Sequence, residues 1–149
     1  MNHLIVPDIV HGQTLTLMEE GASVREAARI MAERRIGAVM IVRGERLEGI
    51  LTERDVLVRV VAPSRDPDTT QIGEVMTRNP DTVAPDSRAI DALLRMREKG
   101  YRHLPVVDKD RVVGMVSIRD LYDAVKQELE EDLQEREAFI FGSGYATAP

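Results

Sequence analysis

The 149-residue sequence contains no cysteine and no tryptophan, and aromatic residues make up only 3% of it. Without cysteine, disulfide bonds and thiolate chemistry are excluded, and a reducing compartment fits the composition. No apolar run approaches the roughly 20 residues that span a bilayer. The first ten residues, MNHLIVPDIV, lack the basic start and apolar core of a secretory signal. We therefore expect a cytoplasmic protein that does not associate with membranes.

Basic residues are in the minority, with 20 Lys and Arg against 26 Asp and Glu and a net charge of −6. A surface that binds nucleic acid needs a basic face for the phosphates, and single strands also need aromatic platforms. Nucleic acid is therefore not an expected partner. The 43% hydrophobic and 31% charged residues are typical of a globular chain.

The sequence offers no convincing catalytic centre. Its three histidines show no metal-ligand spacing, and no serine–histidine pattern indicates a nucleophile. Gly44 and Gly49 have the glycine spacing of a phosphate loop, but Ile50 and Leu51 replace the lysine and hydroxyl residue that such a loop requires. We expect a protein that is not an enzyme and that needs no metal or cofactor.

The chain contains an internal duplication. The stretch GILTERDVL begins at Gly49, and the similar stretch GMVSIRDLY begins at Gly114, 65 residues later. The same shift pairs Met31 with Met96 without any gap. Repeats decide architecture, so this one indicates two equivalent units, at roughly 14–61 and 79–126.

Both copies are predicted to have the element order strand, helix, strand, strand, helix. Apolar residues at helical spacing, such as Val24, Ala27 and Met31, predict a helix that begins at Ser23. In the first copy we expect an extended piece over 14–18, a helix over 23–35, strands over 38–42 and 49–52 around a hairpin at 43–48, and a helix over 53–61. In the second we expect an extended piece over 81–85, a helix over 87–100, strands over 103–107 and 112–117, and a helix from residue 118.

One copy is too short to cover its own sheet, so the two copies are expected to pack through their sheets. The predicted class is α/β (α+β), with two β-α-β-β-α repeats related by a pseudo-two-fold axis. We assign residues 7–70 to the first repeat with its linker, 71–126 to the second, and 127–149 to a helical extension and tail. The linker at 62–78 is expected to contain a short helical turn near 72–76.

Together, the stretches IGAVMIVRGERLEGILTERD and YRHLPVVDKDRVVGMVSIRD resemble a tandem pair of CBS domains, also called a Bateman module. The resemblance covers roughly residues 7–126. It departs from the family in the first copy, where Met40 replaces the proline found at Pro105 in the second copy, and Ala38 matches His103. The resemblance implies a regulatory module, commonly a dimer, that binds adenine nucleotides.

The start of each last helix has two interpretations. Thr52 with Asp55, and Ser117 with Asp120, have the spacing of a capping box, in which the hydroxyl and the carboxylate bond the helix's own backbone. The same geometry presents free N–H groups to a phosphate and an acceptor carboxylate to a diol such as ribose. By the family resemblance, the two aspartates bind ribose and the hydroxyl residues lie beside them.

The resemblance also implies further contacts. Arg119 and Arg54 would meet phosphates, although both could be solvated, and His103 could be merely packed or exposed. The first-copy site lacks the proline and would be weaker or empty. The base-side wall of the second site would consist of Thr82, Val83, His103, Leu104 and Pro105.

The last helix is predicted to continue past the second copy. Leu121, Val125, Leu129 and Leu133 recur every four residues among many acids. This stripe either covers the edge of the pair or packs against a partner subunit. The function expected overall is a nucleotide-sensing homodimer that takes AMP, ADP or ATP as its ligand, and the alternative is a ligand-independent assembly module for an unknown regulated protein.

Overall fold

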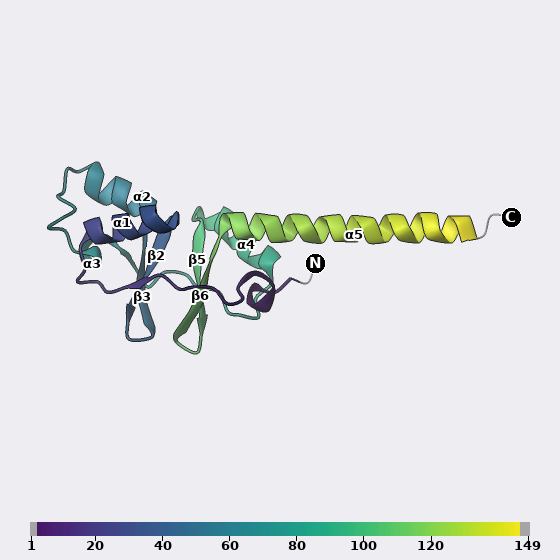
Figure 1. Cartoon of the computed structure of the whole chain (residues 1–149), viewed down its shortest axis with the longest axis horizontal. Coiled ribbons are helices and arrows are strands. Elements are labelled where there is room, and N and C mark those ends of the chain that lie inside the picture. The colour runs from purple at the N-terminus through teal and green to yellow at the C-terminus, as the bar shows by residue number, and fades with distance from the viewer. Residues whose placement is uncertain (1–2, 147–149) are drawn as a thin grey trace.

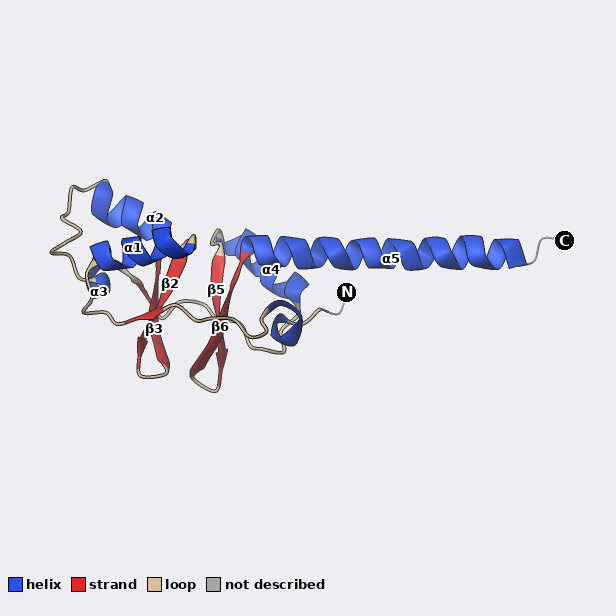
Figure 2. Cartoon of the chain, viewed as in Figure 1, coloured by secondary structure: helices blue, strands red, loops and turns tan. Residues whose placement is uncertain are grey.

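The computed structural model describes residues 3–146, with side chains through residue 141. Figure 1 shows two hairpins standing side by side, helices above them, and one long helix that extends away from the rest of the chain. Figure 2 shows the same alternation of strands and helices in both halves. The mixed α/β class is therefore confirmed.

The first copy contains most of a four-stranded sheet, in which β2 and β3 form an antiparallel hairpin. The turn of this hairpin is shorter than predicted, because Gly44 adopts a φ of +64° and Arg43 already pairs with Arg46. Strand β3 therefore begins three residues earlier than expected. The elements are β1 (Leu17–Met18), α1 (Val24–Arg34), β2 (Ala38–Arg43), β3 (Arg46–Thr52), α2 (Glu53–Val56) and the π-helical turn η2 (Leu57–Val61).

The second copy has a two-stranded sheet made of the β5–β6 hairpin. The extended piece expected over 81–85 makes only an isolated parallel bridge, between Val83 and Val106. The tail, for which the sequence indicated no helix, continues the last helix through Ala146. The elements are α4 (Ala89–Lys99), β5 (His103–Asp108), β6 (Arg111–Ser117) and α5 (Ile118–Ala146).

The amino-terminal segment packs on the second copy, far along the chain. It forms the turn η1 (Ile5–Ile9), in which Val10 N donates to Ile5 O at 2.8 Å and Val6 is extended. Ile5 N donates to Ser87 O at 2.9 Å, and Val6 N donates to Pro85 O at 2.8 Å. The Ile5 side chain is fully buried in the second copy's core. Residues 3–10 therefore complete the second copy and not the first.

The linker, in turn, packs on the first copy. It forms α3 (Ile72–Val75), the short helical turn that the sequence predicted, and then β4 (Thr77–Arg78), which pairs antiparallel with β3. Ile72 is fully buried in the first copy's core. The packing thus crosses the boundary at residue 70 that the sequence suggested, so that each core contains a segment from beyond its own copy.

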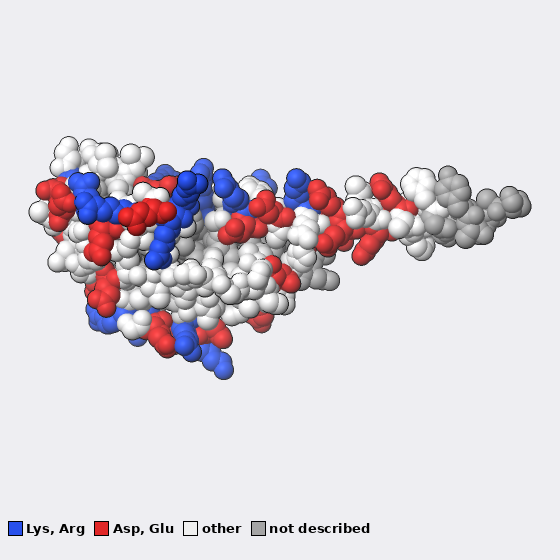
Figure 3. Space-filling model, viewed as in Figure 1, with Lys and Arg blue, Asp and Glu red and all other residues white. Residues whose placement is uncertain are grey.

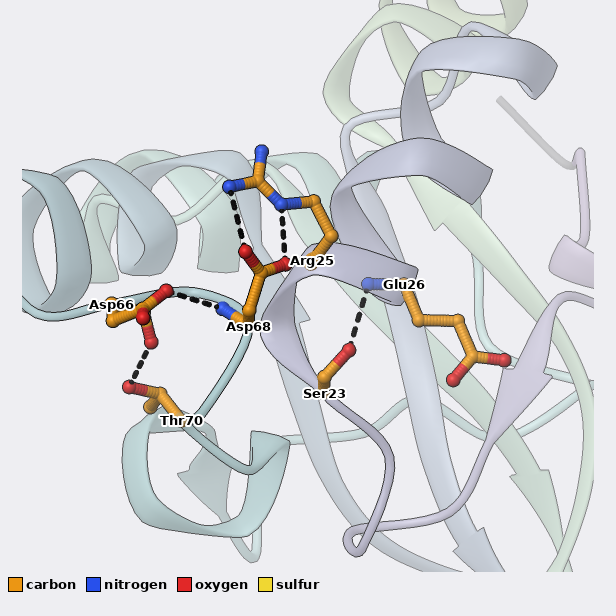
Figure 4. A network of polar contacts seen from close by, with 6 residues as sticks. All are labelled: Ser23, Arg25, Glu26, Asp66, Asp68 and Thr70. Carbon is orange, nitrogen blue, oxygen red and sulfur yellow. Dashed lines mark hydrogen bonds and ion pairs between the residues drawn. The ribbon is translucent and has the colours of Figure 1, made fainter.

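A polar network attaches the start of the linker to helix α1 (Figure 4). Arg25 Nε donates to Asp68 Oδ1 at 2.8 Å, and Asp68 N donates to Asp66 Oδ1 at 2.9 Å. The hydrogen bond from Arg25 lowers the pKa of Asp68. Thr70 Oγ1 donates to Asp66 O at 2.7 Å. This network directs residues 66–70 along α1, so that the next residues enter the first core.

The two copies pack through their sheets, as predicted. The cluster between them is apolar and draws residues from both hairpins, with Met40 and Val42 from β2 and Val112 from β6 buried at its centre. Burial of this apolar surface supplies the main driving force for pairing the copies. Leu15, Leu47 and Met115 pack against the cluster.

The glycine that begins each repeated motif is required because a segment from outside that copy passes close to its backbone. A Cβ atom on Gly49 would lie 2.7 Å from Thr77 O, and one on Gly114 would lie 2.6 Å from Val10 Cγ1. Both distances are too short for any side chain. The repeated glycine therefore marks the point where the crossing chain touches the last strand of each hairpin.

We expect Gly49→Ala to lower the free energy of unfolding by roughly 1–3 kcal/mol, because the backbone carbonyl of Thr77 cannot move aside without disturbing β4. Urea denaturation measures this change. Gly21→Ala is the control, since nothing lies within 4 Å of its Cβ position, and should stay within about 1 kcal/mol of the wild type. Equal stability of the two variants would contradict the close approach at Gly49.

Candidate functional site

Both repeated motifs begin a helix with a reciprocal pair of hydrogen bonds. Thr52 N donates to Asp55 Oδ2 at 3.0 Å, and Asp55 N donates to Thr52 Oγ1 at 3.1 Å. Ser117 N donates to Asp120 Oδ2 at 3.0 Å, and Asp120 N donates to Ser117 Oγ at 3.2 Å. The capping interpretation is therefore confirmed at both positions.

Capping uses only one oxygen of each carboxylate. Among the described residues, Asp120 Oδ1 has no hydrogen-bond or ion-pair partner, while Asp55 Oδ1 lies 3.9 Å from Arg59 Nε. An ionised carboxylate can accept about four hydrogen bonds, so each aspartate keeps acceptor capacity after it has capped its helix. The two interpretations of the motif are thus compatible, and Asp120 has more unused acceptor capacity than Asp55.

Cavity 1, with a volume of about 810 Å³, lies beside the second motif. Ser117, Arg119 and Asp120 line it from the second copy, and Met31 and Gly37 line it from the first. The volume falls in the range of roughly 300–1,000 Å³ that small-molecule sites occupy. The carboxylate that caps a helix of the second copy therefore lines a cavity to which the first copy also contributes residues.

Cavity 2, of about 690 Å³, lies beside the first motif. Thr52, Arg54 and Asp55 line it from the first copy, and Tyr101 and Leu104 line it from the second. The two cavities are thus built alike, each combining the motif of one copy with the segment before the central hairpin of the other. Desolvation and the hydrogen bond that the Tyr101 hydroxyl donates to Asp81 raise the pKa of Tyr101 to about 12.

A shared wall separates the two cavities. Glu53, Arg102 and His103 line both of them. A Cβ atom on Gly37 would lie 3.2 Å from Glu53 Oε1 and 3.2 Å from His103 Cε1, so Gly37 lets the two copies approach closely here. These three side chains are therefore accessible from both cavities.

His103 is held neutral near pH 7 by its position in this wall. Desolvation lowers its pKa below 6.5, the repulsion of Arg102 acts in the same direction, and the carboxylates of Glu53 and Asp120 oppose the shift. A neutral imidazole can accept one hydrogen bond and donate another. His103 therefore offers polar contacts to a ligand without adding a charge.

Because the pKa of folded His103 lies below its unfolded value, protonation favours the unfolded chain. We expect the wild type to lose stability relative to His103→Gln as the pH falls from about 6.5 through the folded pKa, and no such difference above pH 7. Urea denaturation at several pH values measures this. His11→Gln, at an exposed histidine, is the matched control, and parallel curves for wild type and His103→Gln would refute the proposed burial.

The residues predicted to form the base-side wall of the second site do not all line the same cavity. Of these five residues, only His103 lines cavity 1 beside Asp120, Leu104 lines cavity 2, and Thr82, Val83 and Pro105 line neither. Val83 is buried in the second core, where its N–H donates to Pro105 O at 3.0 Å. Thr82 O accepts a hydrogen bond of 2.8 Å from Arg95 Nη1. These three residues build the fold behind the site.

Sequence reasoning missed several lining residues, namely Arg35, Gly37, Glu53 and Arg102. A signal was available, because the shift of 65 that takes Gly49 to Gly114 also takes Gly37 to Arg102. In the second copy only the strand residues His103, Leu104 and Pro105 were assigned to a site, and not the segment before the hairpin. Its counterpart in the first copy was not assigned either.

No group of three or more His, Asp or Glu residues that could hold a metal ion occurs among the described residues. Within the same part of the chain, every helix is too short or too polar to cross a bilayer.

Comparison with known proteins identifies the repeated unit. A family model for the CBS domain matches residues 14–62 and 72–127. The Arabidopsis thaliana CBS domain-containing protein CBSCBSPB2 is 40% identical over 133 residues, which cover 88% of this chain and 24% of that protein. This chain therefore spans about a quarter of that relative's length.

Two solved structures have the same fold. The CBS domain protein PAE2072 from Pyrobaculum aerophilum, complexed with AMP, is 30% identical with a TM-score of 0.69, covering 75% of this chain and 84% of its own. The CBS domain pair of MJ0100, in complex with 5′-methylthioadenosine and S-adenosyl-L-methionine, is 28% identical with a TM-score of 0.76 and covers 86% and 99%. The duplicated motifs, the paired hairpins and these matches agree, and the chain belongs to the CBS domain family as a tandem CBS pair.

Proposed function

We propose that this CBS pair is a regulatory module that binds an adenine nucleotide of the AMP, ADP or ATP type between its two copies. The observation that carries the proposal is the lining of the two cavities. Each cavity combines the helix-capping aspartate of one copy with lining residues from the other. The adenosyl ligands named for PAE2072 and MJ0100 support the ligand class. The nucleotide is the signal, and no catalysis is proposed.

In the proposed site, the free oxygen of Asp120 accepts hydrogen bonds from the ribose diol, and Ser117 lies beside the sugar or phosphate. Arg119 meets the phosphate, since guanidinium groups pair with it in a forked geometry. Asp55 and Thr52 have the corresponding roles toward the ribose in cavity 2, which Arg54 also lines. The adenine ring contacts His103 in cavity 1, and His103 or Leu104 in cavity 2.

A ligand in either cavity touches both copies, so it stabilises the arrangements in which both sets of contacts form. The regulatory step is then a shift in population between relative positions of the copies, which a partner protein detects. The ligand must bind one arrangement better than the other, because equal affinity would shift nothing. The acidic, cysteine-free composition supports a cytoplasmic location for this role.

Isothermal titration of the purified protein with AMP, ADP and ATP tests the proposal. We expect saturable binding of at least one of them, with a dissociation constant in the micromolar range that corresponds to roughly −8 kcal/mol. Absence of heat with all three, confirmed by unchanged thermal unfolding at millimolar ligand, would refute nucleotide sensing.

The second candidate function is assembly, and the exposed residues of α5 favour it. The predicted stripe is divided, because Leu121 is fully buried and Val125 packs on the second core, whereas Leu129 and Leu133 are 50% and 59% exposed. Farther along, Ile140 is 63% exposed on the same side of the helix. Figure 3 shows acidic side chains along this part of α5. We propose that the outer stripe packs against a second copy in a homodimer.

The double substitution Leu129→Glu with Leu133→Glu is expected to convert the dimer to a monomer, because four carboxylates would be forced into a shared apolar contact. Light scattering coupled to gel filtration measures the mass. Gln127→Glu with Gln134→Glu adds the same charge to α5 away from the stripe and should leave the dimer intact. A monomeric wild type, or a dimer that survives the leucine substitutions, would overturn this contact.

A further inference from the structure

The two cavities are alike in construction and opposite in charge. Cavity 1 is lined by three arginines, Arg35, Arg102 and Arg119, against two carboxylates, Glu53 and Asp120. None of these three arginines forms an ion pair within residues 3–141. Their guanidinium groups therefore remain available to an anionic ligand.

Cavity 2 has the reverse balance, with two arginines, Arg54 and Arg102, against three carboxylates, Glu53, Asp55 and Asp81. Arg102 and Glu53 belong to the shared wall and are counted in both cavities. The difference therefore comes from the residues that each cavity has alone.

Two cations outside the lining lie near cavity 2, namely Arg59 beside Asp55 and Arg95, whose charge acts on Tyr101 and whose Nη1 donates to Thr82 O at 2.8 Å. Arg59 is not part of its lining, and Arg59 Nη1 donates to Val75 O at 3.0 Å and to Met76 O at 3.2 Å. Its Nε is 3.9 Å from Asp55 Oδ1, so it weakens that carboxylate's field without presenting a charge to the ligand. Tyr101, which donates to Asp81 at 2.8 Å, also adds no positive charge.

We propose that the two cavities select different adenosyl ligands: cavity 1 takes a phosphorylated adenosine, and cavity 2 takes an adenosyl compound without negative charge, either an uncharged nucleoside or a cationic adenosyl sulfonium. The ribose is recognised alike in both, by Asp120 and Asp55. Selection arises where the 5′ substituent lies, since a phosphate is attracted by an excess of arginines and repelled by an excess of carboxylates. This inference rests on the proposed adenosine-binding function.

AMP and adenosine are the matched probes, because they differ only in the phosphate. Methyl groups report the cavities separately: Met31 and Met115 line cavity 1 alone, and Ile50 lines cavity 2 alone. In a titration followed by methyl NMR, AMP is expected to shift the two methionine methyls at a concentration at least fivefold below that which shifts Ile50. Adenosine is expected to reverse the order, and to shift Ile50 even when AMP already saturates cavity 1.

Two charge variants complete the test. Arg119→Gln should weaken AMP several-fold at the methionine reporters and leave adenosine at Ile50 unchanged. Asp81→Asn keeps an acceptor for Tyr101, removes one negative charge, and should strengthen AMP several-fold at Ile50. The inference is overturned if AMP and adenosine fill the same cavity first, or if Asp81→Asn leaves the AMP response at Ile50 unchanged. Failure of both probes to move any reporter would instead refute adenosine binding itself.

Discussion

Replacing Asp120 by asparagine is expected to weaken AMP binding by about 10- to 100-fold while the fold is retained. A hydrogen bond to a charged group contributes roughly 1.5–3 kcal/mol, which corresponds to this range. The carboxylate accepts from both ribose hydroxyls in the proposed site, whereas the asparagine amide presents N–H donors on one side. Isothermal titration with AMP measures the loss.

Asparagine separates the two roles of this residue. Its carbonyl oxygen can still accept the hydrogen bond that Ser117 N now donates at 3.0 Å, and its own N–H can still donate to Ser117 Oγ. The start of α5 should therefore keep both capping hydrogen bonds, whereas alanine would keep only the one from its backbone N–H to Ser117 Oγ. Thermal unfolding of the variant should lie close to that of the wild type.

Asp123→Asn is the control, because Asp123 is an exposed acid on the same helix and lines neither cavity. It removes the same charge without touching the motif, so AMP affinity should hardly change. If Asp120→Asn binds AMP as tightly as Asp123→Asn does, then Asp120 serves only as a cap. Ligand recognition would then have to be assigned elsewhere, and the assembly function would become the better proposal.

Ile5→Ala is expected to lower the free energy of unfolding by roughly 2–5 kcal/mol, the cost of emptying a large buried aliphatic position. Ile5 is near the amino-terminus, where most chains tolerate substitution. It is nevertheless fully buried among side chains of α4, β5 and α5. Urea denaturation measures the loss, which is a large fraction of the stability of a domain of this size.

Val61→Ala is the control, because that aliphatic side chain is 61% exposed, lines neither cavity and should contribute less than about 0.5 kcal/mol. Methyl NMR of Ile5→Ala should show the larger changes at Leu104 and Val106 in the second core, and smaller ones at Leu51 in the first. Stability equal to that of Val61→Ala would contradict the packing of the amino-terminal segment in the second copy's core.

Much of the architecture could be predicted because it is recorded in local periodicity and in the repeat. The apolar spacing from Val24 to Met31 places helix α1, and the constant shift of 65 from Gly49 to Gly114 establishes two equivalent units. The capping boxes also follow from short-range spacing, since an N-cap bonds a backbone group only three residues away. The hairpin turn at Gly44 was estimated too long because strand ends depend on pairing, which spacing alone does not reveal.

The assignment of Thr82, Val83 and Pro105 to a ligand wall came from the family resemblance. The structure places none of the three in the lining of cavity 1 or cavity 2, and Val83 pairs with the β5 strand and has its side chain in the core. A sequence cannot distinguish the two faces of such a segment when its partner strand is more than twenty residues away. His103 and Leu104, at the beginning of β5, do line cavities, because the strand end lies between the copies.

By itself, the sequence determined the duplicated unit, its order of helices and strands, and the pair of aspartates at equivalent helix starts, since all of these depend on residues close together or on a simple repeat. Only the tertiary structure decided that residues 3–10 pack in the second copy's core and residues 72–78 on the first copy. It also decided that Glu53, Arg102 and His103 form one wall between two cavities of opposite charge. These features depend on contacts between residues far apart in the chain, which the burial of apolar surface selects without leaving a local pattern.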